Sequence, residues 1–258
     1  MPQLHGIFDS HAHYDDRRFA DDRDKLLPHM HADSVAALIN VGCDLPSSRK
    51  SIALAKQYPF VYAAVGIHPE ESVNVDGDYV DRLAELAKEQ KVVAIGEIGL
   101  DYHYEDTVKP VQKRVFEHQL KLAEQLDLPV IIHSRDAVQD TIDILKKANN
   151  RGVLHCYTGS AETARAYLEL GYYIGFTGVV TFPNAKKVVE AAKIVPLDRL
   201  LLETDCPYMA PAPHRGERCT SDLIAHTAAR LAEIKGIPAQ ELIDLARENT
   251  CRLFGIAL

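Results

Sequence analysis

The sequence predicts an α/β fold, a TIM-like (β/α)8 barrel in which eight parallel strands are surrounded by helices. Short apolar runs recur along the chain without polar interruption, as expected for strands that are buried on both faces. The segments between them are about 10 to 17 residues long and have helical periodicity, which is typical of crossovers between parallel strands. The length of 258 residues also fits such a barrel, which often has about 250 residues in one domain. We therefore expect a single domain over residues 1–258.

The apolar runs are the predicted strands. They are rich in valine, isoleucine and leucine, and they span Leu4–Asp9, Ala36–Val41, Val61–Val65, Val92–Gly96, Pro129–Ile132, Val153–His155, Tyr172–Phe176 and Leu200–Glu203. Strands that alternate with helices through the whole chain indicate a closed parallel barrel. An open doubly wound sheet is the alternative, but it usually has fewer strands, and no G-x-G-x-x-G motif follows the first run.

The helices are predicted from apolar residues that recur every three or four positions. The pattern is clearest in Val80–Ala87 and Val115–Leu126, which lie between predicted strands. A last amphipathic stretch, Ala239–Leu253, follows the eighth strand and predicts an additional helix on the outside of the barrel.

Charge and cysteine content exclude several classes of protein. The net charge of −8 argues against a broad phosphate-binding surface, while a local basic patch at a cleft is still compatible with it. The five cysteines form no C-x-x-C pair, which is typical of reduced thiols rather than of disulfides. No apolar run approaches the roughly 20 residues of a membrane span, and no leader pattern is present. We expect a cytoplasmic protein without disulfides, with a monomer as the default.

Ionisable residues are concentrated where the predicted strands end. The first strand leads into His11 and His13, whose side chains point the same way because strand residues alternate between faces. Seven such residues follow six of the strands, namely His11, His13, His68, Glu97, His133, His155 and Asp205. The carboxyl ends of barrel strands meet at one face, which is where the active sites of such barrels lie.

Each of these residues alone has a structural explanation. A histidine that closes a strand is often a hydrogen-bonded structural residue, and Asp205, close before Pro207, could cap a helix. The joint pattern favours a shared site, because the opposite strand ends carry no comparable set. Imidazole and carboxylate ligands suit zinc, manganese or iron, and a carboxylate that bridges two cations accounts for the surplus of ligands. The pattern predicts two divalent cations and metal-assisted hydrolysis.

An ordered set of segments resembles the TatD-type metal-dependent deoxyribonucleases, a branch of the amidohydrolase-like barrel superfamily. The segments are FDSHAH, VGIHPE, IGEIGLDY, the stretch Gln112–Ala137 that ends in LPVIIHSRDA, HCYTGS, GFTG, LLLETDCPYMAP and PHRG. They extend from the first predicted strand to beyond the eighth, so the resemblance covers nearly the whole chain.

The resemblance implies a role for each of these residues. A first cation, magnesium, manganese or zinc, would be held by His11, His13, Glu97 and Asp205, and a second by His133 and His155 with Glu97 shared. Asp205 would also be the general base for the attacking water. His68 would contact the substrate or the leaving group rather than a metal, so that the expected catalytic residues are Asp205, His68 and Glu97.

Other residues near these motifs have weaker predicted roles. Glu203 shares a face with Asp205, so we expect it to support the ligands or to lie deeper in the barrel. Asp101 and Tyr102 could reach the mouth, although an aspartate in a loop often only forms a turn. Cationic partners for a phosphodiester are expected on the surrounding loops, at Arg135, His214, Arg215 and Arg218.

The loop after PHRG departs from the family pattern. It continues ERCTSD, and Cys219 stands where the family has asparagine, which changes the loop expected to contact the substrate. Cys206 and Cys219 could be metal-sensitive thiols, but a buried small residue is favoured for each.

We expect a divalent-metal-dependent hydrolase that acts on DNA ends as a 3′ to 5′ exonuclease. The acidic net charge favours contact with a few nucleotides over a grip on long duplex. Hydrolysis of another ester, an amide or a lactone, for example aminoacyl-tRNA, is the alternative, because two metals polarise either kind of oxygen. A non-catalytic metal-binding scaffold is the third possibility, and the complete ligand set argues against it.

Overall fold

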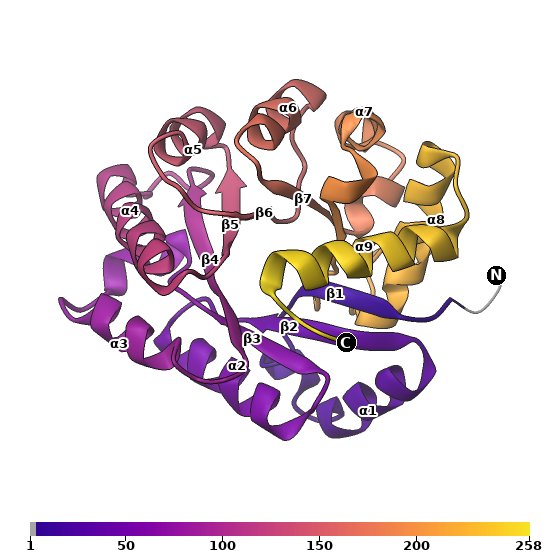
Figure 1. Ribbon diagram of the computed structural model, residues 1–258, viewed down its shortest axis with the longest axis horizontal. Coiled ribbons are helices and arrows are strands. Elements are labelled where there is room, and N and C mark those ends of the chain that lie inside the picture. Colours follow the sequence, from indigo (N-terminus) through magenta and orange to yellow (C-terminus); the bar gives the residue numbers. More distant parts are fainter. Residues whose placement is uncertain (1–3) are drawn as a thin grey trace.

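The computed structural model describes residues 4–258 of the chain. Its strands form one parallel sheet in chain order, β1 to β8, and Figure 1 shows the helices arranged around them. The strands are β1 Ile7–Ala12, β2 Val35–Val41, β3 Val61–Val65, β4 Val92–Asp101, β5 Val130–Arg135, β6 Gly152–Leu154, β7 Tyr173–Phe176 and β8 Leu200–Leu202. The predicted TIM-like barrel is confirmed.

Each strand is followed by helical structure before the next strand begins. The α-helices of the described residues are α1 Arg23–Asp33, α2 Leu45–Gln57, α3 Tyr79–Leu86, α4 Lys109–Leu126, α5 Val138–Leu145, α6 Ala161–Glu169, α7 Lys186–Ile194, α8 Ile224–Lys235 and α9 Ala239–Phe254. Short 3-10 helices lie in the loops, at η1 Arg17–Phe19, η2 Pro69–Asn74, η3 Gly178–Thr181, η4 Leu197–Arg199 and η5 Ser221–Leu223. Within residues 4–258 no helix combines the length and the apolar character of a membrane span.

The strands that carry the predicted motifs extend further toward the mouth than expected. The first strand was predicted over Leu4–Asp9 but forms over Ile7–Ala12, and β4 continues past Gly96 to Asp101. The continuation of β4 pairs with β5, where Gly99 lies opposite His133. The polar residues in these segments point into the barrel and are buried, so backbone pairing rather than side-chain hydrophobicity sets the strand length.

The barrel closes where the ends of β1 and β8 meet. The N–H of Asp205 donates to the carbonyl of His11 at 2.9 Å, and the N–H of His13 donates to the carbonyl of Cys206 at 2.9 Å. Ala12 and Cys206 form a parallel bridge between these two hydrogen bonds. This seam therefore joins the first and last strands at the residues that the sequence predicts as metal ligands.

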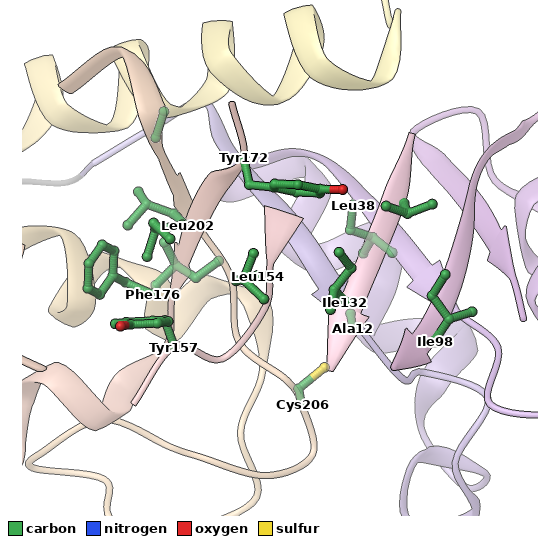
Figure 2. Packing of buried hydrophobic residues seen from close by; sticks show 14 of the residues in the cluster. Ala12, Leu38, Ile98, Ile132, Leu154, Tyr157, Tyr172, Phe176, Leu202 and Cys206 are labelled. Atoms are coloured by element: carbon green, nitrogen blue, oxygen red, sulfur yellow. The ribbon is translucent and has the colours of Figure 1, made fainter. Parts of the chain in front are cut away.

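Outside the strands, a large apolar cluster packs the barrel against its helices. Figure 2 shows Ile132, Leu154, Phe176 and Leu202 from neighbouring strands within this cluster, with Tyr172 beside them. Along each strand, these outward-pointing residues alternate with residues that point into the barrel, because successive side chains of a strand lie on opposite faces.

Inside the barrel, the side chains near the starts of the strands are apolar and form a second cluster. Its strand members include Phe8, Ile39, Ala64, Ala94, Ile131, Val153, Tyr173 and Leu201. Leu253, Phe254 and Ile256, at the end of α9, belong to the same cluster. The helix expected on the outer wall therefore covers the N-terminal opening of the barrel with its last turn, and in Figure 1 it crosses in front of β1.

Candidate metal centre

The six residues predicted as metal ligands converge at the C-terminal end of the barrel. In the described part of the chain, potential ligand atoms lie within 4.8 Å of one another in the groups His11–His13–Asp205, His11–Glu97–His155, His13–Cys43–Glu97 and His68–Glu97–His133. Glu97 belongs to three of these groups. The chain thus brings residues from β1, β4, β5 and the ends of β3, β6 and β8 into one cluster.

Glu97 is at the middle of the cluster, and its two oxygens face different histidines. Oε2 lies 3.4 Å from Nε2 of His11 and 3.8 Å from Nε2 of His13. Oε1 lies 2.7 Å from Nε2 of His155 and 2.9 Å from Nδ1 of His133. Burial alone would raise the pKa of Glu97, but the surrounding histidines hold it well below its usual value. A carboxylate with one oxygen toward each of two imidazole groups has the geometry of a bridging ligand.

His11 and His13 face each other through the same type of nitrogen. Their Nε2 atoms are 3.0 Å apart, while Nδ1 of His13 lies 2.9 Å from the carbonyl of Val41. A carbonyl only accepts, so Nδ1 of His13 carries the proton and its Nε2 carries a lone pair. Asp205 completes the group, with Oδ1 at 3.5 Å from Nε2 of His13 and at 3.8 Å from Nε2 of His11.

His133 is oriented by Asp101, which lies at the end of β4 rather than in a loop. Nε2 of His133 lies 2.9 Å from Oδ2 of Asp101, so this nitrogen keeps its proton in the neutral ring, and Nδ1, 2.9 Å from Oε1 of Glu97, is then the nitrogen whose lone pair can bind a cation. Burial lowers the pKa of His133, but its hydrogen bonds to Asp101 and Glu97 more than offset this and raise the pKa to about 9. A carboxylate behind a histidine is the usual arrangement that orients imidazole ligands of metals.

His155 is buried above Glu203 in the barrel interior. Its Nδ1 has no hydrogen-bond partner and lies 3.7 Å from Oε1 of Glu203. Burial raises the pKa of Glu203 to about 7. Gly175 leaves the space for this carboxylate, because a Cβ at that position would lie 2.4 Å from Oε2 of Glu203. Glu203 lies deeper in the barrel than the ligands, which is one of its two predicted positions.

His68 lies beside the cluster and has the opposite proton arrangement. Its Nδ1 accepts from the N–H of Glu70 at 3.2 Å, so in the neutral ring Nε2 is the donor, 3.6 Å from Oε1 of Glu97. Burial lowers the pKa of His68 to about 3, which keeps the ring neutral. A ring that donates toward the centre is suited to contact an oxygen of a substrate rather than to bind a cation.

The cationic residues predicted on the loops lie outside the cluster. Arg135 is the last residue of β5, with Nη1 at 4.0 Å from Oδ2 of Asp101, and Arg215 stacks on Phe182 at 4.5 Å. His214 pairs with Glu217 at 2.9 Å. Arg218 forms a two-pronged ion pair with Asp22 in the loop before α1.

Cys43 is a member of the cluster that the sequence reasoning missed. It follows β2, and its Sγ lies 4.0 Å from Nδ1 of His13 and 4.0 Å from Oε2 of Glu97. The sequence did offer a signal for Cys43, because it follows a predicted strand in the same way as the seven ionisable residues that were assigned to the site. Cys206 and Cys219 are buried in the outer apolar cluster, as favoured for them. All five cysteines are free.

The donor set fits divalent cations. Lone pairs and carboxylate oxygens face one another at 2.7 to 3.8 Å, an arrangement that repels unless a proton or a cation lies between them. Nitrogen and carboxylate donors in this number suit zinc or manganese, and two cations with a shared carboxylate use all of them.

Comparisons with known proteins find relatives over nearly the whole chain. The family model described as TatD related DNase matches residues 8–255. The chain is 40% identical to the uncharacterized metal-dependent hydrolase YabD of Bacillus subtilis, over 97% of this chain and 99% of the relative. It is 33% identical to the 3′-5′ ssDNA/RNA exonuclease TatD of Escherichia fergusonii, over 97% of this chain and 100% of the relative.

A solved structure gives the same result for the fold. The crystal structure of YjjV, a TatD homologue from Escherichia coli, superposes with a TM-score of 0.92 at 33% identity, and the match covers 97% of this chain and 98% of that one. The sequence, the fold and the arrangement of donors all lead to one assignment: the chain belongs to the TatD related DNase family of metal-dependent hydrolases.

Proposed function

We propose that the chain is a nuclease that uses two divalent cations to remove nucleotides from the 3′ ends of DNA. His11, His13, Glu97 and Asp205 would hold the first cation, and His133, His155 and the shared Glu97 the second. The observation that carries this proposal is the position of Glu97, whose two oxygens face two separate sets of imidazole nitrogens.

The residues around the centre have complementary roles in the proposed reaction. Two divalent cations would supply Lewis acidity, which lowers the pKa of the attacking water and polarises the scissile phosphoryl group. Asp205 accepts the proton of that water, because its side chain is 16% exposed toward the mouth while that of Glu97 is 5% exposed. His68 donates from Nε2 to an oxygen of the substrate or the leaving group. Asp101 holds the ring of His133 in place throughout.

The loops at the mouth support a nucleic-acid end as the substrate. Arginines lie over aromatic rings in three of these loops, as Arg18 on Tyr208 at 4.1 Å, Arg215 on Phe182 at 4.5 Å and Arg135 on Tyr104 at 5.7 Å. Tyr104 and Tyr208 are 49% and 47% exposed. Exposed aromatic rings can stack on bases and the guanidinium groups of Arg135 and Arg215 can pair with phosphates, which together bind a few unpaired nucleotides. Arg18 is a weaker candidate for a phosphate, since Asp16 already pairs with it. His214 is a weaker candidate contact, since Glu217 already pairs with it.

The test uses purified protein stripped with a chelator and reloaded with Mg²⁺, Mn²⁺ or Zn²⁺. We expect 5′-labelled single-stranded DNA to shorten stepwise from its 3′ end, and unextended duplex to react more slowly. The same preparations are assayed on panels of carboxylic esters, amides and lactones, including aminoacyl-tRNA. If the protein hydrolyses substrates of one of these panels and leaves the DNA intact, the nuclease proposal is contradicted, while the assignment as a hydrolase still holds.

A further inference from the structure

A thiol lies beside the proposed metal centre, on a backbone that is held in place from both sides. The N–H of Cys43 donates to Oγ of Ser47 at 2.9 Å, which belongs to the capping box of α2. The carbonyl of Cys43 accepts from the N–H of His68 at 2.7 Å. The position of the Cys43 side chain is therefore fixed by the ends of β2 and β3 and not by a free loop.

The distances around Cys43 match those between ligands of one cation. Its Sγ lies 4.0 Å from Oε2 of Glu97, and this oxygen lies 3.8 Å from Nε2 of His13, the nitrogen that carries the lone pair. One potential ligand atom of each of Cys43, His13 and Glu97 lies within 4.8 Å of those of the other two. Around a tetrahedral zinc ion, sulfur and nitrogen ligands at their usual bond lengths are roughly 3.5 Å apart. Small movements of the side chains would thus allow Cys43, His13 and Glu97 to share an ion.

Among the described residues, no other cysteine belongs to such a close group of carboxylate and imidazole donors. Sγ of Cys156 lies against the hydroxyl of Thr177 at 3.6 Å, and Cys206 and Cys219 pack in the outer apolar cluster. Cys251 lies on α9, next to the apolar cluster at the other end of the barrel. Within residues 4–258, Cys43 is the one cysteine grouped with carboxylate and imidazole donors.

We propose that Cys43 is a ligand of the metal centre, where it binds as a thiolate on the same side as His13 and Glu97. Binding releases the thiol proton to solvent. A thiolate ligand favours thiophilic cations such as Zn²⁺, Co²⁺ and Cd²⁺ over Mg²⁺ and Mn²⁺. The inference rests on the proposed metal centre and adds to it a preference for the type of cation.

The test is a titration of Co²⁺ into metal-free protein, followed by absorption spectroscopy. We expect the wild type to develop the near-ultraviolet charge-transfer band of a thiolate bound to cobalt. Cys43→Ser is expected to lose this band and to bind Zn²⁺ about 10-fold more weakly, with Mn²⁺ affinity unchanged within about 3-fold. The matched control Cys251→Ser removes a partly buried thiol far from the centre and is expected to keep both the band and the affinities.

The outcomes separate this inference from the function on which it rests. If Co²⁺ binds the wild type and produces only the d–d bands of nitrogen and oxygen ligands, Cys43 is not a ligand and the metal centre still stands. If the band persists in Cys43→Ser, the inference is also overturned. If neither protein binds Co²⁺ or Zn²⁺, the metal centre itself is refuted. The measurement on the wild type needs no variant, so a folding defect in Cys43→Ser would leave the test valid.

Discussion

At the residue scale, hydrogen bonds behind the histidines decide which ring nitrogen faces the centre. Val41 and Asp101 accept from the outer nitrogens of His13 and His133, so in the neutral form of each ring it is the inner nitrogen that carries the lone pair. The N–H of Glu70 has the reverse effect on His68. These partners separate rings suited to bind a cation from a ring suited to donate a hydrogen bond.

The first prediction concerns Asp101, which orients His133. In Asp101→Asn the amide no longer offers two carboxylate oxygens, and the ring loses the charged partner that fixes its proton on Nε2. We expect the affinity for the second cation to fall about 10- to 100-fold. Competition with a chelating dye measures it. Asp136→Asn is the control, because that aspartate also pairs with a histidine, His103, but its side chain is 65% exposed. Equal affinities in the two variants would refute the role of Asp101.

The second prediction concerns His68. We expect His68→Ala to lower kcat about 10²- to 10⁴-fold while the protein still binds two cations, because the neutral ring donates a hydrogen bond to the substrate without being a ligand. Turnover and metal content by mass spectrometry are measured on the same sample. His118→Ala, which removes a histidine that contacts Tyr79 on the outside of the barrel, is expected to keep full activity. A loss of metal in His68→Ala would make His68 a ligand.

The residue types of the centre were predictable from the sequence, but their partners were not. His-x-His after a strand and the ends of five other strands identified the histidines, Glu97 and Asp205. The pair Asp101–His133 joins two neighbouring strands and the contact of Cys43 with Glu97 joins two strands that are separated by β3, so both depend on how the strands are aligned. A shift of one residue between β4 and β5 would turn Asp101 away from His133, and no spacing along the chain specifies that alignment.

At the scale of elements, the strands were identified correctly, and β3 has the predicted bounds, but the ends of β1 and β4 were not predicted. β1 and β4 continue into polar residues because the barrel interior near the mouth is lined by polar side chains that contact one another. A run such as Glu97–Asp101 alternates charge, glycine and apolar residues and does not resemble a buried strand, although all of it is buried. The backbone pairing of this run with β5 outweighs the low intrinsic preference of its residues for a strand.

The end of α9 carries the third prediction. Phe254 is 5% exposed and belongs to the inner apolar cluster, so Phe254→Ala should lower the free energy of unfolding by about 3–5 kcal/mol. Urea denaturation followed by circular dichroism measures this. Leu258→Ala, at a side chain that is 62% exposed, should stay within about 0.5 kcal/mol of the wild type. We expect kcat of the folded fraction of Phe254→Ala to be unchanged, because this residue lies at the opposite end of the barrel from the proposed metal centre. A small loss of stability in Phe254→Ala would show that the end of α9 does not stabilise the barrel.

At the scale of the whole molecule, bound cations should stabilise the barrel against unfolding. The donors come together only in the folded chain, so a cation at about 100 times its Kd should add about 2.7 kcal/mol to the free energy of unfolding. Calorimetry with Zn²⁺ or Mn²⁺ should give a higher Tm than with a chelator. In Glu97→Gln, which removes the shared carboxylate, we expect little or no increase. An equal increase in both proteins would place the bound cations elsewhere.

The seam between β1 and β8 has a consequence for how the protein is made. His11 and His13 are translated near the beginning of synthesis, but they cannot meet Asp205 until almost four-fifths of the polypeptide has been translated. The segment directly after the last strand supplies both the carboxylate of Asp205 and the hydrogen bonds that hold His11 and His13 in place. A nascent chain can therefore offer only a partial coordination shell. Full occupancy by the cations would report that translation has passed the eighth strand and that the barrel has closed.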